Sequence, residues 1–169
     1  TDAKRVAGAL AARGARPQAV GSNGCRLALD RLGESVAMRE TASCIGEVDD
    51  AEWKEIQGLV SIIGVSSAEA LTPLVMVEQE GPAFERASDL LAGLGSAGVS
   101  RLSPLIADSR WFVQRNGARL LGRIASAEAI PLLQPFLRKS DPRVMREAIR
   151  ALGNIDDPGA ARAIHTALR

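Results

Sequence analysis

The chain has 169 residues, of which 46% are hydrophobic and only 3% aromatic, and it contains no Tyr. A core of this composition must be built from Leu, Ile, Val and Ala, which suits closely packed helices and disfavours strands. The formal net charge is +1, but residues 1–107 carry −4 and residues 108–169 carry +5. Because nucleic-acid binding alone usually needs a larger basic excess, the uneven charge predicts a one-sided electrostatic contact instead.

Targeting and redox signals are weak. We find no apolar run that approaches the length of a membrane span and no basic segment followed by a signal-peptide core, so a cytoplasmic protein is expected. The chain begins at Thr1 without Met, which indicates a fragment of a longer protein. Cys25 and Cys44 have no CxxC spacing, and we interpret them as two reduced thiols in helix cores rather than a redox pair.

The N-terminal fifty residues predict helices in a less regular pattern than the rest. Residues 3–13 predict a helix, residues 14–24 a loop rich in Gly, Pro, Ser and Asn, and residues 26–32 a short helix. Residues 35–48 predict a good helix, although their similarity to residues 145–155 conflicts with the repeat register. Either residues 35–48 form a second helix by coincidence, or residues are missing around them.

A hydrophobic residue followed by Gly recurs along the chain, with successive spacings of 31, 31, 27 and 31 residues. Gly is expected just past the end of a helix, where it accepts the left-handed backbone conformation. The pattern therefore predicts five helix ends in a repeating array. The pairs are Leu32 and Gly33, Ile63 and Gly64, Leu94 and Gly95, Leu121 and Gly122, and Leu152 and Gly153.

Helix pairs follow from this repeat. Residues 111–124 and 142–155 align at their glycines and place apolar residues on one helix face. Second helices are expected over 68–77, 97–106, 127–137 and 159–168, each after a short connector that forces an antiparallel neighbour. Pairs repeated about every 30 residues stack, because one pair cannot bury its own apolar face.

The predicted fold is therefore all-α, a right-handed α-solenoid of about four to five helix pairs. We expect residues 1–169 to form a single domain, in which residues 1–50 match the repeat weakly and residues 51–169 clearly.

Prolines punctuate these helices. Pro82 and Pro142 are expected in the first turn of their helices, and Pro104 and Pro131 near helix starts. Pro73 and Pro135 fall inside predicted second helices, where they are expected to introduce kinks.

The segment Asp-Pro-Arg-Val-Met-Arg-Glu-Ala-Ile-Arg-Ala-Leu-Gly-Asn-Ile-Asp-Asp-Pro, residues 141–158, resembles the HEAT repeat of the short bacterial type, also called the phycobilisome-lyase HEAT-like repeat. The resemblance covers residues 108–169 most closely and extends over 51–107. It implies a bacterial scaffold whose inner helices present a concave binding face. Members of the family bind proteins, nucleic acid or a tetrapyrrole, so the ligand stays open.

Catalytic, metal-binding and cofactor-binding residues are not predicted. His165 is the only histidine, which is too few for a zinc site. The adjacent carboxylates Asp49 and Asp50, and Asp156 and Asp157, lie at predicted helix boundaries and are interpreted as helix-capping acids. A tetrapyrrole lyase or a HEAT-like DNA glycosylase would need more aromatic residues than this chain has, so we expect a non-enzymatic protein with no cofactor.

The candidate partner-binding residues are arginines on two equivalent helices. Their spacing of four residues places them on one face of each helix, and stacking of the two repeats sets the rows side by side. Such a patch can bind carboxylates or phosphates in a bidentate manner. The residues are Arg115, Arg119 and Arg123 on the first helix, and Arg146 and Arg150 on the second, flanked by Arg110 and Arg143.

A structural role competes with this interpretation for Arg115 and Arg146. In HEAT-like repeats the matching arginines bond to acids or carbonyls of a neighbouring repeat, and Asp108, Asp141 and Glu147 are available here.

Three functions fit the sequence. The first is a scaffold or regulatory module that binds a protein partner with an acidic segment. The alternative is binding of nucleic acid or another polyanion through the arginines. The third is a spacer or sensor module within a longer chain, which predicts exposed apolar side chains at the first or last helix. The oligomeric state and the identity of the partner stay open.

Overall fold

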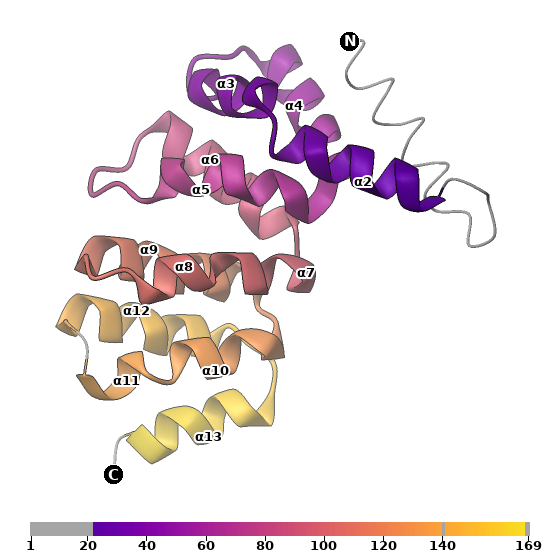
Figure 1. The fold of residues 1–169 in the computed structure, drawn as a ribbon. Helices are drawn as coiled ribbons and strands as arrows, with labels where there is room; N and C mark the ends of the chain where they lie inside the picture. The colour runs from indigo at the N-terminus through magenta and orange to yellow at the C-terminus, as the bar shows by residue number, and fades with distance from the viewer. Residues whose placement is uncertain (1–21, 140, 168–169) are drawn as a thin grey trace. The chain divides into compact units, whose positions relative to one another are not determined.

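The structure is a computed structural model that describes residues 22–139 and 141–167. Within these residues every regular element is helical and none is a strand (Figure 1). The predicted all-α solenoid class is therefore confirmed. The helix expected over residues 3–13 and most of the loop expected over 14–24 lie outside the described residues.

The elements follow one another with short connectors, as the repeat predicts. In chain order they are α2 (Ser22–Gly33), α3 (Val36–Cys44), α4 (Asp50–Ile63), η1 (Gly64–Ser67), α5 (Ala68–Val75), α6 (Pro82–Gly93), α7 (Ser96–Val99), η2 (Ser100–Leu102), α8 (Ser103–Ala107), α9 (Trp111–Ile124), η3 (Ala127–Ala129), α10 (Ile130–Leu133), α11 (Phe136–Lys139), α12 (Pro142–Gly153) and α13 (Pro158–Ala167).

The chain divides into two compact units. The first comprises residues 1–74 and 80–90, and the second comprises residues 75–79 and 91–169. The family resemblance is closest in the second unit, which also holds all the candidate arginines.

In the first unit, α2 packs against α4 and η1. Gly33 ends α2 at a point where no side chain fits, since a Cβ there would lie 2.6 Å from the backbone carbonyl of Ser66. The Ser66 hydroxyl donates to the carboxylate of Asp30 and fixes the same contact. Arg86 donates from Nη1 to the carbonyls of Ile45 and Val48, at 2.8 and 2.7 Å, and so ties α6 to the turn after α3.

Residues 36–44 form α3, which ends four residues before the end of the helix expected over residues 35–48. α3 follows α2 directly, its N-cap is Ser35, and the Ser35 hydroxyl accepts from the backbone nitrogen of Met38. The short helix expected over residues 26–32 is longer than expected, because α2 already begins at Ser22.

The helix-core position predicted for Cys44 is wrong. Cys44 is a free thiol, but it is exposed because it is the last residue of α3.

Residues 50–75 contradict the expectation that no apolar run approaches the length of a membrane span. The helical run from Asp50 to Val75 has 26 residues and contains an 18-residue window with a mean hydropathy of 1.5, which by length and composition is enough for a membrane span. The pair Pro82–Gly93 and Ser96–Ala107 passes the same test together, although it is bent by 119°. Burial gives the first run another explanation, because Ile56, Val60 and Leu71 lie in the core of the first unit.

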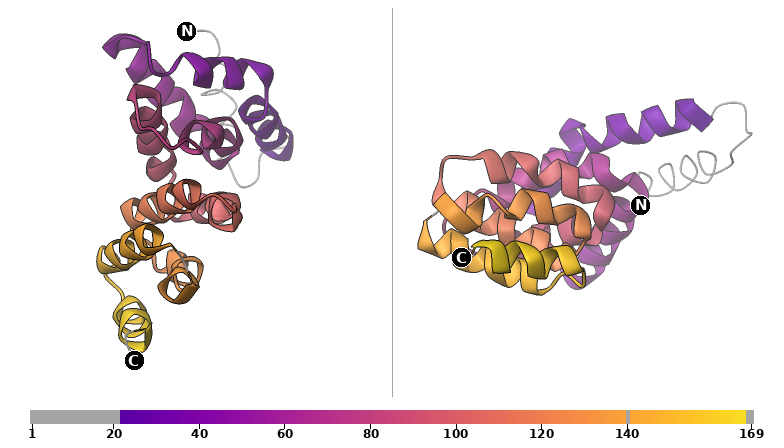
Figure 2. Two further views of the ribbon diagram at one scale, coloured as in Figure 1. Left: turned by 90° about the vertical axis from the view of Figure 1, so that its left-hand side faces the viewer. Right: turned by 90° about the horizontal axis from the view of Figure 1, so that it is seen from below.

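In the second unit, α9 and α12 lie side by side, and α8, α10 and α11 form a second layer against them (Figure 2). The bounds predicted for α9 are confirmed at both ends, and α12 begins at Pro142 as predicted. The buried side chains are mainly aliphatic, and the largest of them in α9 and α12 are Val113, Leu120, Leu121, Val144 and Leu152.

The role predicted for Gly122 is wrong. Gly122 does not end α9, which continues to Ile124 and is closed by Ala125 at φ 53°. Instead Gly122 is buried, and a Cβ at this position would lie 2.7 Å from the Cα of Ala151 on α12. Gly64 and Gly95 do follow helix ends with positive φ, 71° and 62°, as the repeat predicts.

Proline breaks two second helices that the sequence predicts as continuous. Pro104 and Pro131 stand in the first turns of α8 and α10. Pro135 separates α10 from α11, since proline offers no backbone N–H to continue the helix. Pro73 is accommodated inside α5 with its side chain exposed.

Candidate functional site

The N-terminus of α9 is fixed by a local ion pair. The carboxylate of Asp108 accepts from the backbone nitrogen of Arg110 at 2.8 Å and from its Nε and Nη2 at 2.9 and 2.8 Å. These hydrogen bonds to Arg110 hold the pKa of Asp108 at about 2. The guanidinium of Arg110 also lies 5.5 Å from the ring centroid of Phe112. Arg110 is therefore engaged within its own turn.

The N-terminus of α12 repeats this arrangement. Asp141 accepts from the backbone nitrogen, Nε and Nη2 of Arg143, each at 2.9 Å, and these bonds lower its pKa to about 2. The guanidinium of Arg143 lies 3.3 Å from the ring centroid of Trp111. Stacking of an arginine over an indole ring is attractive, so this contact joins the starts of α12 and α9.

Arg115 is held by its neighbours rather than presented to solvent. Its Nε and Nη2 donate to Oδ1 of Asn116 at 3.2 and 3.0 Å, and its guanidinium lies 5.3 Å from the ring centroid of Trp111. Arg115 is only half-exposed. These contacts give Arg115 a structural position, with Asn116 as its hydrogen-bond acceptor.

Asn116 is a buried polar residue that the sequence analysis missed. Its side chain is 0% exposed, and its Nδ2 donates to the carbonyls of Val75 and Val77, both at 2.9 Å. The amide thus fastens the loop before α6 to α9 within the second unit. The available signal was an uncharged polar residue next to Gly117 on the apolar face of the helix, a position where a buried amide needs partners.

The remaining candidate arginines differ in exposure. Arg119 is half-buried, whereas Arg123 is exposed near the end of α9. Arg146 is exposed and makes no hydrogen bond or ion pair with another described residue. Arg150 is 63% exposed, and its Nη1 donates to Oε2 of Glu147 at 2.8 Å.

The three acids expected near Arg115 and Arg146 have other partners. Asp108 bonds Arg110, Asp141 bonds Arg143, and Glu147 bonds Arg150. Each pair is local because the residues are two or three positions apart in the chain.

Exposed apolar side chains accompany the arginines of α12. Met145 is 36% exposed and Ile149 37%. Arg146 and Arg150 follow them by one position each, so the four residues form one stripe of the helix surface. We call Met145, Arg146, Ile149 and Arg150 the α12 outer face.

Aligning α12 with α9 by the repeat shows that the positions equivalent to the α12 outer face are less exposed on α9. Ile149 aligns with Ala118, which is fully buried, and Gly153 aligns with Gly122, which lies against Ala151 of α12. Gly153 instead has open space where a Cβ would stand. On α9 this face is covered by a neighbouring helix. On α12 none of the described residues covers the equivalent face.

One acid of each adjacent pair caps a helix, as predicted. Asp49 caps α4 by accepting from the backbone nitrogens of Ala51 and Glu52, and the Glu52 carboxylate accepts from the nitrogen of Asp49 in return. Asp157 accepts from the backbone nitrogen of Gly159 at 2.6 Å in the first turn of α13. Across the described ranges, no group of three or more His, Cys, Asp or Glu residues is placed to hold a metal ion.

Comparison with known proteins supports the repeat. A family model described as HEAT repeats matches residues 99–169. The chain is also similar to an engineered protein of known crystal structure, with 20% sequence identity and a TM-score of 0.40. The alignment covers 99% of this chain and 85% of the engineered protein's chain. A comparison with curated proteins found no match. The resemblance to HEAT-like repeat proteins predicted from the sequence is thus confirmed, with the family match lying in residues 99–169.

Proposed function

We propose that this chain is a non-catalytic protein-binding module and that the α12 outer face is the surface that binds the partner. HEAT repeats generally mediate protein–protein interactions as scaffolds. HEAT repeat proteins are also typically non-enzymatic. The proposal specifies which surface of this chain is used and which chemistry its partner brings.

The observation that carries the proposal is the mixed character of the α12 outer face. Met145 and Ile149 expose apolar area, while Arg146 and Arg150 present guanidinium groups beside them. Exposed apolar side chains next to arginine are typical of protein-binding surfaces, where Arg and Met are enriched. A purely solvated helix face would carry polar residues at positions 145 and 149.

The matching partner surface is an acidic amphipathic helix. Its apolar side chains would cover Met145 and Ile149, and its Asp or Glu carboxylates would accept from Arg146 and Arg150. The equivalent face of α9 supports a helical partner, because there Gly122 is covered by a helix, α12. Arg123 on α9 is a further exposed cation of the same unit.

A nucleic acid or another polyanion is the alternative partner, and the net charge of +5 over residues 108–169 supports it. Two of the arginines in this region, Arg110 and Arg143, are already neutralised by Asp108 and Asp141. Phosphate groups would also leave Met145 and Ile149 uncovered. These observations favour a protein partner over a polyanion.

The test is affinity capture from a lysate of the source cells, with the chain as bait, with and without nuclease treatment, read by mass spectrometry. The proposal predicts protein partners that survive nuclease treatment and are lost with an Arg146→Glu and Arg150→Glu bait. Capture that disappears with nuclease would contradict the proposal and place polyanion binding first.

A further inference from the structure

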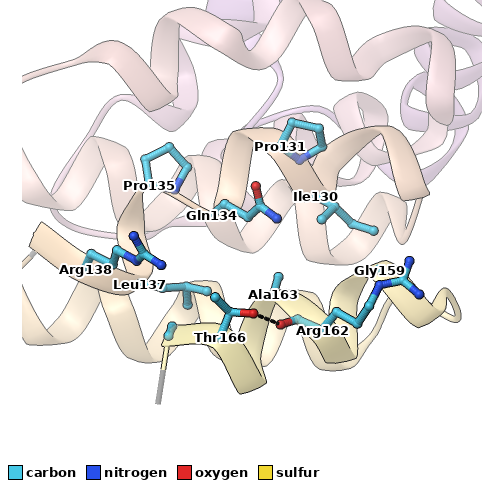
Figure 3. A pocket seen from close by; sticks show the side chains of 11 residues that line it. Ile130, Pro131, Gln134, Pro135, Leu137, Arg138, Gly159, Arg162, Ala163 and Thr166 are labelled. Carbon is cyan, nitrogen blue, oxygen red and sulfur yellow. Dashed lines mark hydrogen bonds between the residues drawn. The ribbon is translucent and has the colours of Figure 1, made fainter. Parts of the chain in front are cut away.

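A groove separates α13 from α10 and α11 in the second unit (Figure 3). Its volume is about 580 Å³, which lies in the range of clefts that take side chains of a bound ligand. The floor is apolar, since Ile130, Leu137 and Ala163 lie along it. Ile130 and Leu137 are themselves almost fully buried, so the floor is a rigid part of the core rather than a loose surface.

The charged side chains around this floor are all positive. Arg138 on α11 and Arg162 on α13 lie at opposite ends of the groove in Figure 3, and both are exposed. The other polar side chains that line it are Gln134 and Thr166, and none of the lining residues is acidic. Neither guanidinium makes a hydrogen bond or ion pair with the described residues.

The acid next to the groove is already engaged. Asp157 accepts from the backbone nitrogen of Gly159 and caps α13. Thr166 donates from its hydroxyl to the backbone carbonyl of Arg162 at 2.8 Å, so the hydrogen of this hydroxyl is already engaged within α13.

We propose that this groove is a second docking site, for an extended acidic peptide segment of a partner protein. Apolar side chains of the segment cover Ile130, Leu137 and Ala163, and its carboxylates meet Arg138 and Arg162. Charge complementarity selects this occupant, because two cations at the ends of an apolar floor reject a basic segment and leave a neutral one without ionic partners.

Other occupants fit less well. A second copy of the same groove would bring Arg138 and Arg162 against identical arginines, which is repulsive. A nucleic acid would satisfy the two cations but would not fill the aliphatic floor, which offers no aromatic ring for base stacking.

The probe is a short fluorescein-labelled peptide of alternating Glu and Leu, and its binding to the whole chain is measured by fluorescence anisotropy. A peptide of alternating Lys and Leu is the matched control. The proposal predicts that the Glu peptide binds at least about tenfold more tightly than the Lys peptide. Equal affinities of the two peptides would overturn it.

Three variants locate the site. Arg138→Glu with Arg162→Glu reverses the charge at both ends, and Gln134→Trp blocks the groove from an exposed position without changing charge. Both are expected to weaken binding of the Glu peptide by about tenfold or more, while Arg31→Glu with Arg101→Glu, which changes the net charge equally at exposed positions outside both proposed sites, leaves it within about twofold. Circular dichroism of each variant verifies that the helices are intact.

A fourth variant, Arg146→Glu with Arg150→Glu on the α12 outer face, distinguishes this inference from the proposed function. Loss of peptide binding only in the Arg146→Glu and Arg150→Glu variant would overturn the groove and support the α12 outer face. Equal loss in all charge-reversal variants, with Gln134→Trp unaffected, would show binding by net charge and would also overturn the groove.

Discussion

Gly122 and Gly153 occupy the same place in two successive repeats but differ in their surroundings. A Cβ at Gly122 would meet the Cα and Cβ of Ala151, both at 2.7 Å, whereas one at Gly153 would meet nothing within 4 Å. Neither glycine has positive φ, so backbone conformation is not the reason for either. The same repeat position therefore requires glycine at Gly122, where two helices pack closely, but not at Gly153.

Gly122→Ala is expected to destabilise the chain by about 1–3 kcal/mol, because α12 must move away from α9 or the packing must strain. Gly153→Ala is the control, and it is expected to be neutral or stabilising by up to about 1 kcal/mol because Ala favours a helix. Urea denaturation followed by circular dichroism measures both. Equal effects of the two substitutions would contradict the packing role of Gly122.

Asn116 carries the largest polar contribution expected from a single side chain. Replacing it by Leu in Asn116→Leu leaves the carbonyls of Val75 and Val77 without their donor and removes the acceptor of Arg115. We expect a loss of about 2–3 kcal/mol in the free energy of unfolding. Gln57→Leu, at an exposed position of α4, is the control, and its effect is expected to stay within about 0.5 kcal/mol.

At the scale of the helix, the acid–arginine pairs at the starts of α9 and α12 make stability depend on acidity. Hydrogen bonds from Arg143 lower the pKa of Asp141 from 3.8 to about 2 in the folded chain. The unfolded chain therefore binds more protons over this interval. The stabilisation is complete above the unfolded value and is lost as the pH falls toward about 2.

Asp141→Asn tests this dependence while keeping an oxygen that can cap α12. The variant is expected to be less stable than the original chain at pH 5, and the difference is expected to shrink as the pH falls from about 4 to about 2. Thermal unfolding at a series of pH values measures the difference. A gap that stays constant down to pH 2 would show that Asp141 acts only as a cap.

An element could be predicted from the sequence where its apolar spacing and turn residues indicated the same bounds as its packing against other helices. α9 was predicted at both ends, because its apolar spacing up to Ile124 and the short connector after it indicate the same helix. The second helices were predicted at the right positions but as continuous helices. The sequence predicted only a kink at Pro135, whereas the structure ends α10 before it and begins α11 after it. Sequence spacing alone could not distinguish a helix-ending Gly from Gly122, which is defined by a contact with Ala151.

At the scale of the whole chain, the candidate site was predicted as a set of arginines, and the structure divides that set. Arg115 donates a hydrogen bond to Asn116, and its guanidinium lies over the ring of Trp111. Arg146 and Arg150, by contrast, are exposed on α12. Side-chain spacing predicts which residues share a helix face, but partners such as Asn116 come from the packing of distant segments. Met145 and Ile149 follow the same rule, because their exposure depends on which helix covers α12.

Exposed apolar residues also bear on the spacer interpretation. Leu27 and Val36 in the first unit are 53% and 61% exposed, in α2 and α3. Exposed apolar side chains in the first described helices are what that interpretation predicts, and the binding proposal accounts only for those on α12. If α2 and α3 serve as a packing surface, Leu27→Ser with Val36→Ser is expected to raise solubility without changing partner capture. Sedimentation at increasing protein concentration measures the first effect.

The central claim is that the α12 outer face binds an acidic protein partner, and charge reversal with a matched control tests it most directly. The partner that survives nuclease treatment is titrated against the original chain, against Arg146→Glu with Arg150→Glu, and against Arg31→Glu with Arg101→Glu, which changes the net charge equally at exposed positions elsewhere. The account predicts a loss of affinity of about tenfold or more in the first variant and little change in the second. Equal affinities of the two variants for the partner would contradict it.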